Sequence, residues 1–169
     1  MPPIGEQIAA LERYLGRQIP SRLREVYIDH TPGKFGLLPL ATGREDESPE
    51  FGATVVERFH SAQMRLASVL GETRGSTQAA AAIPAEYVWP TGLLVVEDYG
   101  CGIYFAVDLD DAALRVVRYE HFDPVDDPED AASGSRLAYQ EPTVPRNLQH
   151  RFTVAADSLD DWLATKRAG

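Results

Sequence analysis

Hydrophobic positions near the start of the chain follow the period of an α-helix. Apolar side chains recur every three or four residues through residues 4–15, which predicts a short amphipathic helix with one buried face. Gly16 is placed to end this helix, because glycine adopts the left-handed conformation that follows many helices at no steric cost. Pro20 suits the first turn of a helix but not its interior. We therefore expect a second helix from Ser21 to about His30.

The middle of the chain changes to β-rich runs that are separated by turn residues. These runs are Leu93–Val96, Ile103–Leu109 and Leu114–Tyr119. Gly100 and Gly102 permit positive φ angles, which favours a tight hairpin between the first two runs. Asp110 and Asp111 favour a turn before the third. The pattern predicts a three-stranded antiparallel meander, and its blurred alternation in the second run is typical of a central strand covered on both faces.

Further elements are expected around this meander. They are a third helix over Thr54–Leu70, an edge strand at Tyr87–Trp89 and a short strand at Phe152–Ala155. A last helix is indicated near the C-terminus, where Asp157 or Ser158 is placed to cap it. Its buried stripe is expected to consist of Leu159, Trp162 and Leu163.

Together these elements predict one α+β domain over residues 1–169. Its core is an antiparallel or mixed sheet of about four to six strands, with N-terminal helices and a C-terminal helix packed around it. A chain of this length suffices for one domain that buries roughly 70% of its unfolded surface. Variable loops are expected near 42–82 and 123–150, where turn-forming residues are frequent.

Composition places the chain among ordinary globular proteins. Of the 169 residues, 44% are hydrophobic and 25% charged, and no apolar run approaches the ~18 residues that a membrane span needs. The first residues lack the basic and apolar regions of a secretory signal, so a cytoplasmic location is expected. The single cysteine, Cys101, excludes an internal disulfide. Lysine is scarce while arginine and alanine are abundant, which indicates a bacterial protein from a genome of high GC content.

Negative charge is concentrated in the middle of the chain. The net charge is −10, and residues 75–135 alone contribute twelve acidic against two basic side chains. A field of this sign repels phosphate backbones and anionic lipids, so we expect neither nucleic-acid binding nor membrane binding. It attracts a basic protein, and the alternative interpretation is a solvated face that serves only solubility.

The residues offer little support for catalysis or a bound ion. Cys101 lies between two glycines with acidic neighbours, which disfavour the reactive thiolate, so a simple hairpin residue is favoured over a nucleophile. The cluster of Asp108, Asp110 and Asp111 offers oxygen ligands, but its spacing is not that of a calcium-binding loop. We therefore expect no catalytic residue, no metal and no cofactor.

Three segments in a fixed order resemble the SUKH superfamily, which includes the Smi/Knr-type cell-wall-assembly regulators of fungi and many bacterial proteins. The segments are IAALERYLGRQIPSRLREVY (Ile8–Tyr27), LLVVEDYGCGIYFAVDL (Leu93–Leu109) and DSLDDWL (Asp157–Leu163). The resemblance implies an α+β domain without enzymatic activity. Bacterial members are similar to immunity proteins, which are cytosolic antidotes that bind and block a toxin, often a nuclease delivered between competing cells. Fungal members look like scaffold or regulatory proteins.

Charge and resemblance together favour a non-enzymatic immunity protein whose acidic surface occludes the basic active site of a toxin. A nuclease needs a basic surface to hold phosphates, and carboxylates are steered to such a surface. Tyr99 or Tyr104 is expected to supply affinity. The predicted partner-binding residues are Glu97, Asp98, Tyr99, Asp108, Asp110, Asp111, Asp123, Asp126, Asp127, Glu129 and Asp130. The alternative is a regulatory or scaffold protein of the Smi/Knr type, with cellular partners and no toxin.

Overall fold

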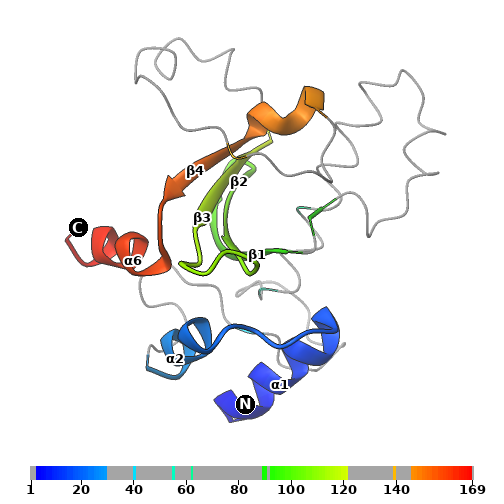
Figure 1. Cartoon of the computed structure of the whole chain (residues 1–169), viewed down its shortest axis with the longest axis vertical. Helices are drawn as coiled ribbons and strands as arrows, with labels where there is room; N and C mark the ends of the chain where they lie inside the picture. The colour runs from blue at the N-terminus through cyan, green and yellow to red at the C-terminus, as the bar shows by residue number, and fades with distance from the viewer. Residues whose placement is uncertain are drawn as a thin grey trace, which may run out of the picture.

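A four-stranded antiparallel sheet forms the centre of the described structure. The computed structural model describes residues 3–29, 40, 55, 62, 89–90, 92–121, 139 and 146–168. The strands, in their order across the sheet, are β1 (Leu93–Gly100), β2 (Ile103–Asp108), β3 (Val116–Glu120) and β4 (Phe152–Ala156) (Figure 1). All neighbouring strands are antiparallel. The predicted meander is confirmed, and the predicted short strand near residue 152 extends it as β4.

Two strand boundaries differ from the predicted runs by more than one residue. Leu114 has a φ of 56°, and its N–H donates a hydrogen bond to the carbonyl of Asp111 at 3.0 Å. It therefore belongs to the turn, and β3 begins at Val116 instead. At the other boundary, β1 continues beyond Val96 to Gly100 and forms the first arm of the hairpin.

A β-bulge in β1 changes the face that its acidic residue occupies. Val95 pairs with Ala106, and the next pairing joins Glu97 to Phe105, so β1 contains one extra residue at this point, the first of its two register shifts against β2. Residues paired across antiparallel strands share a face, and Phe105 packs against the core on the helical side. Strict alternation from Val95 would have placed Glu97 on the opposite face. The bulge therefore turns Glu97 toward the helices.

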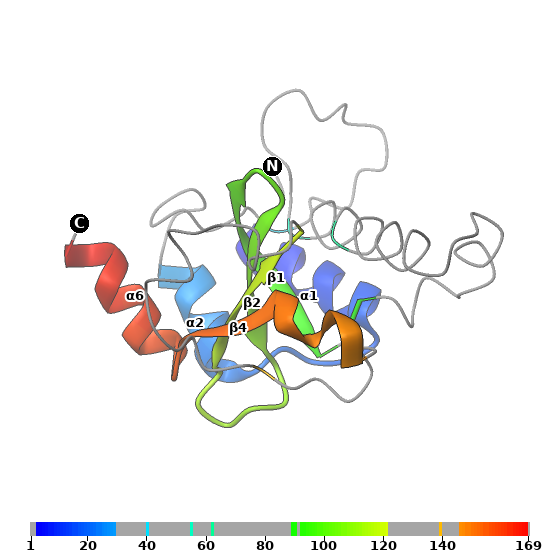
Figure 2. The same ribbon diagram turned by 90° about the horizontal axis from the view of Figure 1, so that it is seen from above.

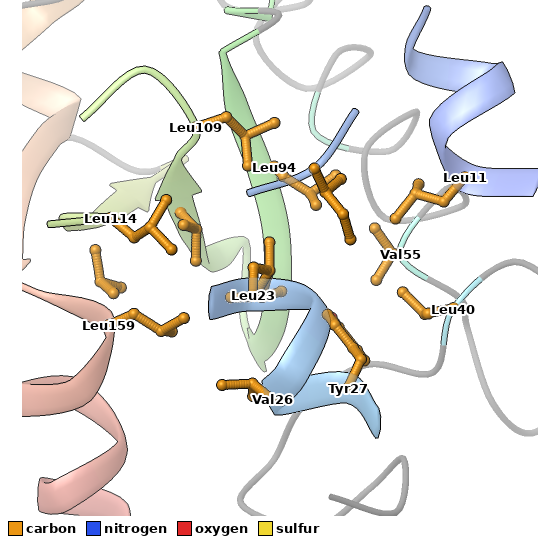
Figure 3. Close-up of a cluster of buried hydrophobic side chains, with 14 of the residues drawn as sticks. Leu11, Leu23, Val26, Tyr27, Leu40, Val55, Leu94, Leu109, Leu114 and Leu159 are labelled. Atoms are coloured by element: carbon orange, nitrogen blue, oxygen red, sulfur yellow. The ribbon is translucent and has the colours of Figure 1, made fainter. Parts of the chain in front are cut away.

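Helices α1 (Ile4–Leu15), α2 (Ser21–Asp29) and α6 (Leu159–Ala168) pack on one face of the sheet (Figures 1 and 3). Their apolar stripes meet the sheet in one buried cluster, in which Leu11, Leu23 and Leu159 are almost fully buried. Leu94 of β1 lies in the same cluster. The predicted first, second and last helices are confirmed. Burial of these stripes supplies the main stabilisation that such short helices need.

The opposite face of the sheet carries a second core that is rich in aromatic residues. Tyr104, Tyr119 and Phe152 of the sheet pack there with Trp89 and Tyr139. The Trp89 ring meets the Tyr119 ring edge-on at 5.3 Å, and its indole N–H donates to the backbone carbonyl that begins β1, at 2.7 Å. Both faces of β2 are therefore covered, as the blurred alternation in its sequence predicted.

The helix ends follow the expected capping chemistry. Gly16 adopts the left-handed conformation after α1, with a φ of 66°. Ser158 is the cap of α6, because its Oγ accepts a hydrogen bond from the N–H of Asp161 at 3.0 Å and donates one to the carboxylate of the same residue at 2.7 Å. The sequence left open whether Asp157 or Ser158 caps this helix, and the structure shows that Ser158 does. A short 3₁₀ helix, η4 (Arg146–Arg151), leads into β4.

Several predicted pieces fall partly or wholly outside the described residues. Of the helix predicted over Thr54–Leu70, only Val55 and Ala62 are described; both have helical backbone and are fully buried. Trp89 lies in a bend and not in the predicted edge strand. The loops near 42–82 and 123–150 are for the most part not described. Among the described helices, none has the length and hydropathy to cross a membrane.

Candidate partner-binding surface

The turn between β1 and β2 has a tightly specified backbone. Gly100, Cys101 and Gly102 have positive φ angles of 95°, 52° and 80°. The Oδ1 atom of Asp98 accepts a hydrogen bond from the N–H of Gly100 at 2.8 Å, which closes the turn. Cys101 is exposed and holds a left-handed conformation that non-glycine residues seldom adopt. We refer to residues 98–102 as the hairpin tip.

Tyr99 extends outward from the hairpin tip. It is 70% exposed, the largest exposure among the described large hydrophobic residues. Its ring contacts the ring of Phe105 in an edge-on arrangement, with centroids 6.3 Å apart and planes at 79°. Phe105 packs in turn on Trp162 of α6 at 6.0 Å. The exposed ring is therefore the outer end of a row of three aromatic side chains that begins in the core.

Glu97 is not part of the outer surface. It is 7% exposed, because the bulge in β1 turns it toward α6. Both of its carboxylate oxygens accept hydrogen bonds from Nζ of Lys166 at 2.6 Å. The same ammonium lies 4.9 Å from the centre of the Trp162 ring and 5.5 Å from that of Phe105. Glu97 thus has a structural partner that links β1 to α6.

The predicted aspartates between β2 and β3 shape their own turn. The Oδ1 atom of Asp108 accepts the N–H of Asp110 at 3.0 Å, and its Oδ2 accepts the hydroxyl of Tyr139 at 2.8 Å. Asp111 caps the end of the turn by accepting the N–H of Ala113 at 2.8 Å. These hydrogen bonds give the carboxylates of Asp108 and Asp111 roles within the fold.

Basic side chains also cancel part of the charge of this turn. Arg17 forms an ion pair with Asp110 at 2.7 Å, and its guanidinium also reaches a backbone carbonyl at the end of β2, at 3.3 Å. Arg115 lies 3.8 Å from Asp111. Both pairs are partly exposed to solvent, so their stabilising effect is modest. The opposite charges of each pair nevertheless cancel when they are seen from a distance.

The predicted acidic residues lie at opposite ends of the sheet. Asp98 and Tyr99 precede β2, whereas Asp110 follows its other end, and the six residues of β2 span about 17 Å. Figure 2 shows the β1–β2 turn and the β2–β3 turn at opposite ends of the ribbon. The surface expected to run from Glu97 to Asp111 is therefore two separate groups, because a whole strand lies between them.

The acidic segment after β3 begins beside the hairpin tip. Ile103 pairs with Glu120, and the N–H of His121 donates to the carbonyl of Gly102 at 3.0 Å. Glu120 is 8% exposed and forms an ion pair with Arg118 at 2.6 Å. The other predicted residues of this segment lie outside the described residues: Asp123, Asp126, Asp127, Glu129 and Asp130. The chain therefore enters its most acidic segment at the same end of the sheet as the hairpin tip.

Tyr104 is a core residue. It is 1% exposed, and its ring stacks on that of Tyr119, with centroids 6.1 Å apart and planes at 15°. Side chains alternate across β2, so Tyr104 faces the aromatic core while Phe105 faces α6. The expectation that Tyr104 supplies affinity for a partner is therefore wrong, and Tyr99 is the aromatic residue that remains available.

The described residues offer groups for recognition. In the part of the chain that the structure describes, no group of three or more metal-ligating side chains is positioned to hold an ion. The groups at the hairpin tip are an exposed phenol ring, a carboxylate and a shaped backbone turn. Such groups are suited to contacts with another protein.

Sequence reasoning missed the partners that engage the predicted carboxylates. Lys166 is separated from Glu97 by 69 positions, and Arg17 from Asp110 by 93. No local spacing rule connects residues so far apart, and the bulge that turns Glu97 inward leaves no signal in a hydrophobic run. Only the folded chain brings these groups together.

The fold defines an α+β domain with α1, α2 and α6 on one face of an antiparallel sheet, and the hairpin tip presents an exposed aromatic ring beside a carboxylate. The sequence profile of the SMI1 / KNR4 family (SUKH-1) matches residues 2–165. This match spans nearly the whole chain, and the protein belongs to the SMI1 / KNR4 family. No curated protein and no solved structure gives a significant match to the chain. The resemblance to the SUKH superfamily is thereby confirmed.

Proposed function

We propose that the protein is a non-enzymatic binding domain, and specifically an immunity protein that binds a basic toxin domain and occludes its active site. The observation that carries this proposal is the family match over residues 2–165, because an immunity-type protein-binding domain is consistent with membership of this family. The net charge of −10 supports a basic partner. A nuclease domain fits well, because an enzyme that holds phosphates with basic side chains also attracts carboxylates.

The proposed surface lies at the end of the sheet that carries the hairpin tip. Asp98 and Tyr99 belong to the tip, and β3 ends beside it at Glu120, three positions before the first of the five acidic residues between 123 and 130. In the proposal these five carboxylates steer the partner, since charges on one side of an interface mainly raise the association rate. Asp110 and Asp111 contribute less, because Arg17 and Arg115 lie beside them at the far end.

The experiment that tests this proposal is capture of partners from a native lysate, with the tagged full-length protein as bait. The bait is used at about 0.05 M and 0.5 M salt, where the screening length falls from roughly 14 Å to about 4 Å. Two variants of equal charge are compared, D126N/D127N at the proposed surface and D110N/D111N at the other end of the sheet. Retained proteins are identified by mass spectrometry.

We expect one basic polypeptide that is retained at low salt and largely lost at high salt. D110N/D111N should retain it as the wild type does, and D126N/D127N should retain less, because only the second change removes steering charge. If the amount of retained polypeptide changed neither with salt nor in either variant, the electrostatic mechanism would be contradicted. Each variant removes the same formal charge from the chain, so a difference in retention between them reports the position of the charge and not its amount.

A regulatory or scaffold role is the second candidate, because membership of the SMI1 / KNR4 family is consistent with a regulatory role as well as with an immunity role. The same capture experiment separates the two. A set of cellular proteins without a toxin among them supports the regulatory role. A gene for a large secreted toxin beside the gene for this protein supports the immunity role.

A further inference from the structure

The exposure of Tyr99 has no explanation in folding. The ring is 70% exposed, whereas the next most exposed large hydrophobic residues in the described part of the chain are Ile28 at 55% and Tyr14 at 42%. Burying an aromatic ring is favourable, so a folded protein gains nothing from holding one in water. An exposed aromatic side chain on a projecting turn is the kind of residue that dominates the energetics of protein interfaces.

The ring of Tyr99 is also held in place by contacts within the protein itself. Asp98 closes the turn through its 2.8 Å hydrogen bond to the N–H of Gly100, and the backbone of His121 bonds to the carbonyl of Gly102 at 3.0 Å. The ring edge meets Phe105, which is itself packed on α6. Binding through such a side chain loses little conformational entropy, because most of the ordering has already occurred in the folded protein.

The aromatic row that ends at Tyr99 already binds one cation at its inner end. The ammonium of Lys166 lies over the rings of Phe105 and Trp162, at 5.5 and 4.9 Å from their centres. An aromatic face attracts cations because the π-electrons give it a partial negative charge. Tyr99 offers the same chemistry at the outer end, where the ring is open to a group from outside the chain.

We propose that Tyr99 is the anchor of the partner-binding surface and that its ring receives an arginine or lysine side chain of a basic partner. This inference rests on the proposed function. Charge favours the same occupant: the chain enters segment 122–130 beside the hairpin tip, and this segment contains five acidic residues and no basic one. The chain as a whole carries a net charge of −10, and the carboxylate of Asp98 is next to Tyr99 in the hairpin tip, so a cationic side chain is attracted to the protein that exposes this ring.

The test uses four single variants of the full-length protein and one defined probe, the purified polypeptide that the wild-type bait retains at low salt. Y99A removes the ring, Y99L keeps an apolar side chain without π-electrons, and Y99F keeps the ring without its hydroxyl. Y14A is the matched control, because it removes another partly exposed tyrosine on α1. Dissociation constants are measured by calorimetry, after urea unfolding has shown that all variants are folded with similar midpoints.

We expect Y99A to weaken binding about 30-fold or more, the size of effect that defines an interface hot spot. Y99L should weaken it nearly as much, Y99F no more than about 3-fold, and Y14A no more than about 2-fold, because only the aromatic face at position 99 is used. Equal binding by wild type and Y99A would overturn the inference and leave the proposed function standing. Wild-type affinity of Y99L would overturn the cation contact. A wild-type bait that retains no polypeptide would overturn the proposed function and this inference with it.

Discussion

Tyr27 of α2 buries a hydroxyl group that gains no hydrogen bond. The residue is 1% exposed, and its oxygen has no hydrogen-bond partner in the described structure. Figure 3 shows the ring among apolar side chains of the core on the helical side. Burial raises the pKa of the Tyr27 hydroxyl above its ordinary value of 10.0, because the phenolate would be poorly solvated there. The ring of Tyr27 fills space in the core, while its polar oxygen lies there without a hydrogen-bond partner.

Tyr27→Phe should therefore leave the protein as stable as the wild type, or more stable by up to about 1 kcal/mol at pH 7. Above pH 10 the unfolded wild-type chain releases the Tyr27 proton while the folded chain retains it, so the wild type loses stability and the variant's advantage grows. Urea unfolding at pH 7 and about pH 11 measures both effects. Tyr139→Phe is the control, because it removes a hydroxyl that donates to Asp108 at 2.8 Å, and it should destabilise by about 0.5–1.5 kcal/mol. A comparable loss from Tyr27→Phe would show that its hydroxyl has a partner.

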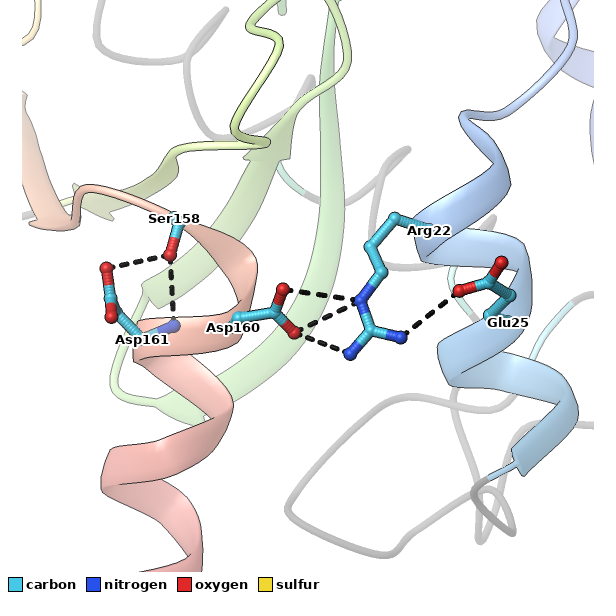
Figure 4. Close-up of polar contacts among 5 residues, drawn as sticks. All are labelled: Arg22, Glu25, Ser158, Asp160 and Asp161. Carbon is cyan, nitrogen blue, oxygen red and sulfur yellow. Dashed lines mark hydrogen bonds and ion pairs between the residues drawn. The ribbon is translucent and has the colours of Figure 1, made fainter.

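At the scale of elements, two ion pairs of different strength join α6 to other elements, in addition to its apolar packing. Arg22 of α2 contacts the carboxylate of Asp160 in α6 at 2.5 Å and that of Glu25 at 3.2 Å (Figure 4). The Arg22 guanidinium lowers the pKa of the Asp160 carboxyl, but both side chains are exposed and such pairs contribute little to stability. The second ion pair is the contact between Glu97 and Lys166, where one partner is buried.

Lys166→Met should destabilise the protein by about 1–3 kcal/mol, because it leaves the carboxylate of Glu97 buried without its ammonium. The double variant E97Q/K166M should recover at least half of this loss, since it also removes the charge. Arg167→Met is the matched control one residue away; it is exposed and should cost no more than about 0.5 kcal/mol. Urea unfolding gives the free energies. If Lys166→Met behaved like Arg167→Met, the link between β1 and α6 would have no energetic role.

Element positions were more predictable than the contacts between elements. The helices 4–15 and 21–29 and the meander follow from local periodicity and from turn residues such as Gly100 and Gly102. The bulge in β1 did not, because it depends on how β1 is paired with β2 and not on its own residues. The interpretation of Tyr104 failed for a related reason: exposure at the end of a strand depends on which layer covers each face, and the aromatic core was not visible in the sequence.

At the scale of the whole molecule, the negative charge is divided unevenly. The described residues contain thirteen acidic and ten basic side chains, which leaves them a net charge of −3 out of −10. Within them, Glu97, Asp110 and Glu120 are matched by basic partners. Five of the remaining negative charges lie between residues 123 and 130. The sequence alone located the charge in the middle of the chain, but only the fold showed that carboxylates such as that of Glu97 are paired internally.

The proposed function is neutralisation of a toxin, and bacterial growth measures this neutralisation. The polypeptide retained by the bait is produced from an inducible promoter, alone and together with the wild-type protein, D110N/D111N or D126N/D127N. We predict that the polypeptide alone arrests growth and that the wild-type protein and D110N/D111N restore it, with D126N/D127N restoring it less at equal protein levels. A polypeptide that does not arrest growth, or an arrest that persists with the wild-type protein present, would show that the protein is not an immunity protein against it.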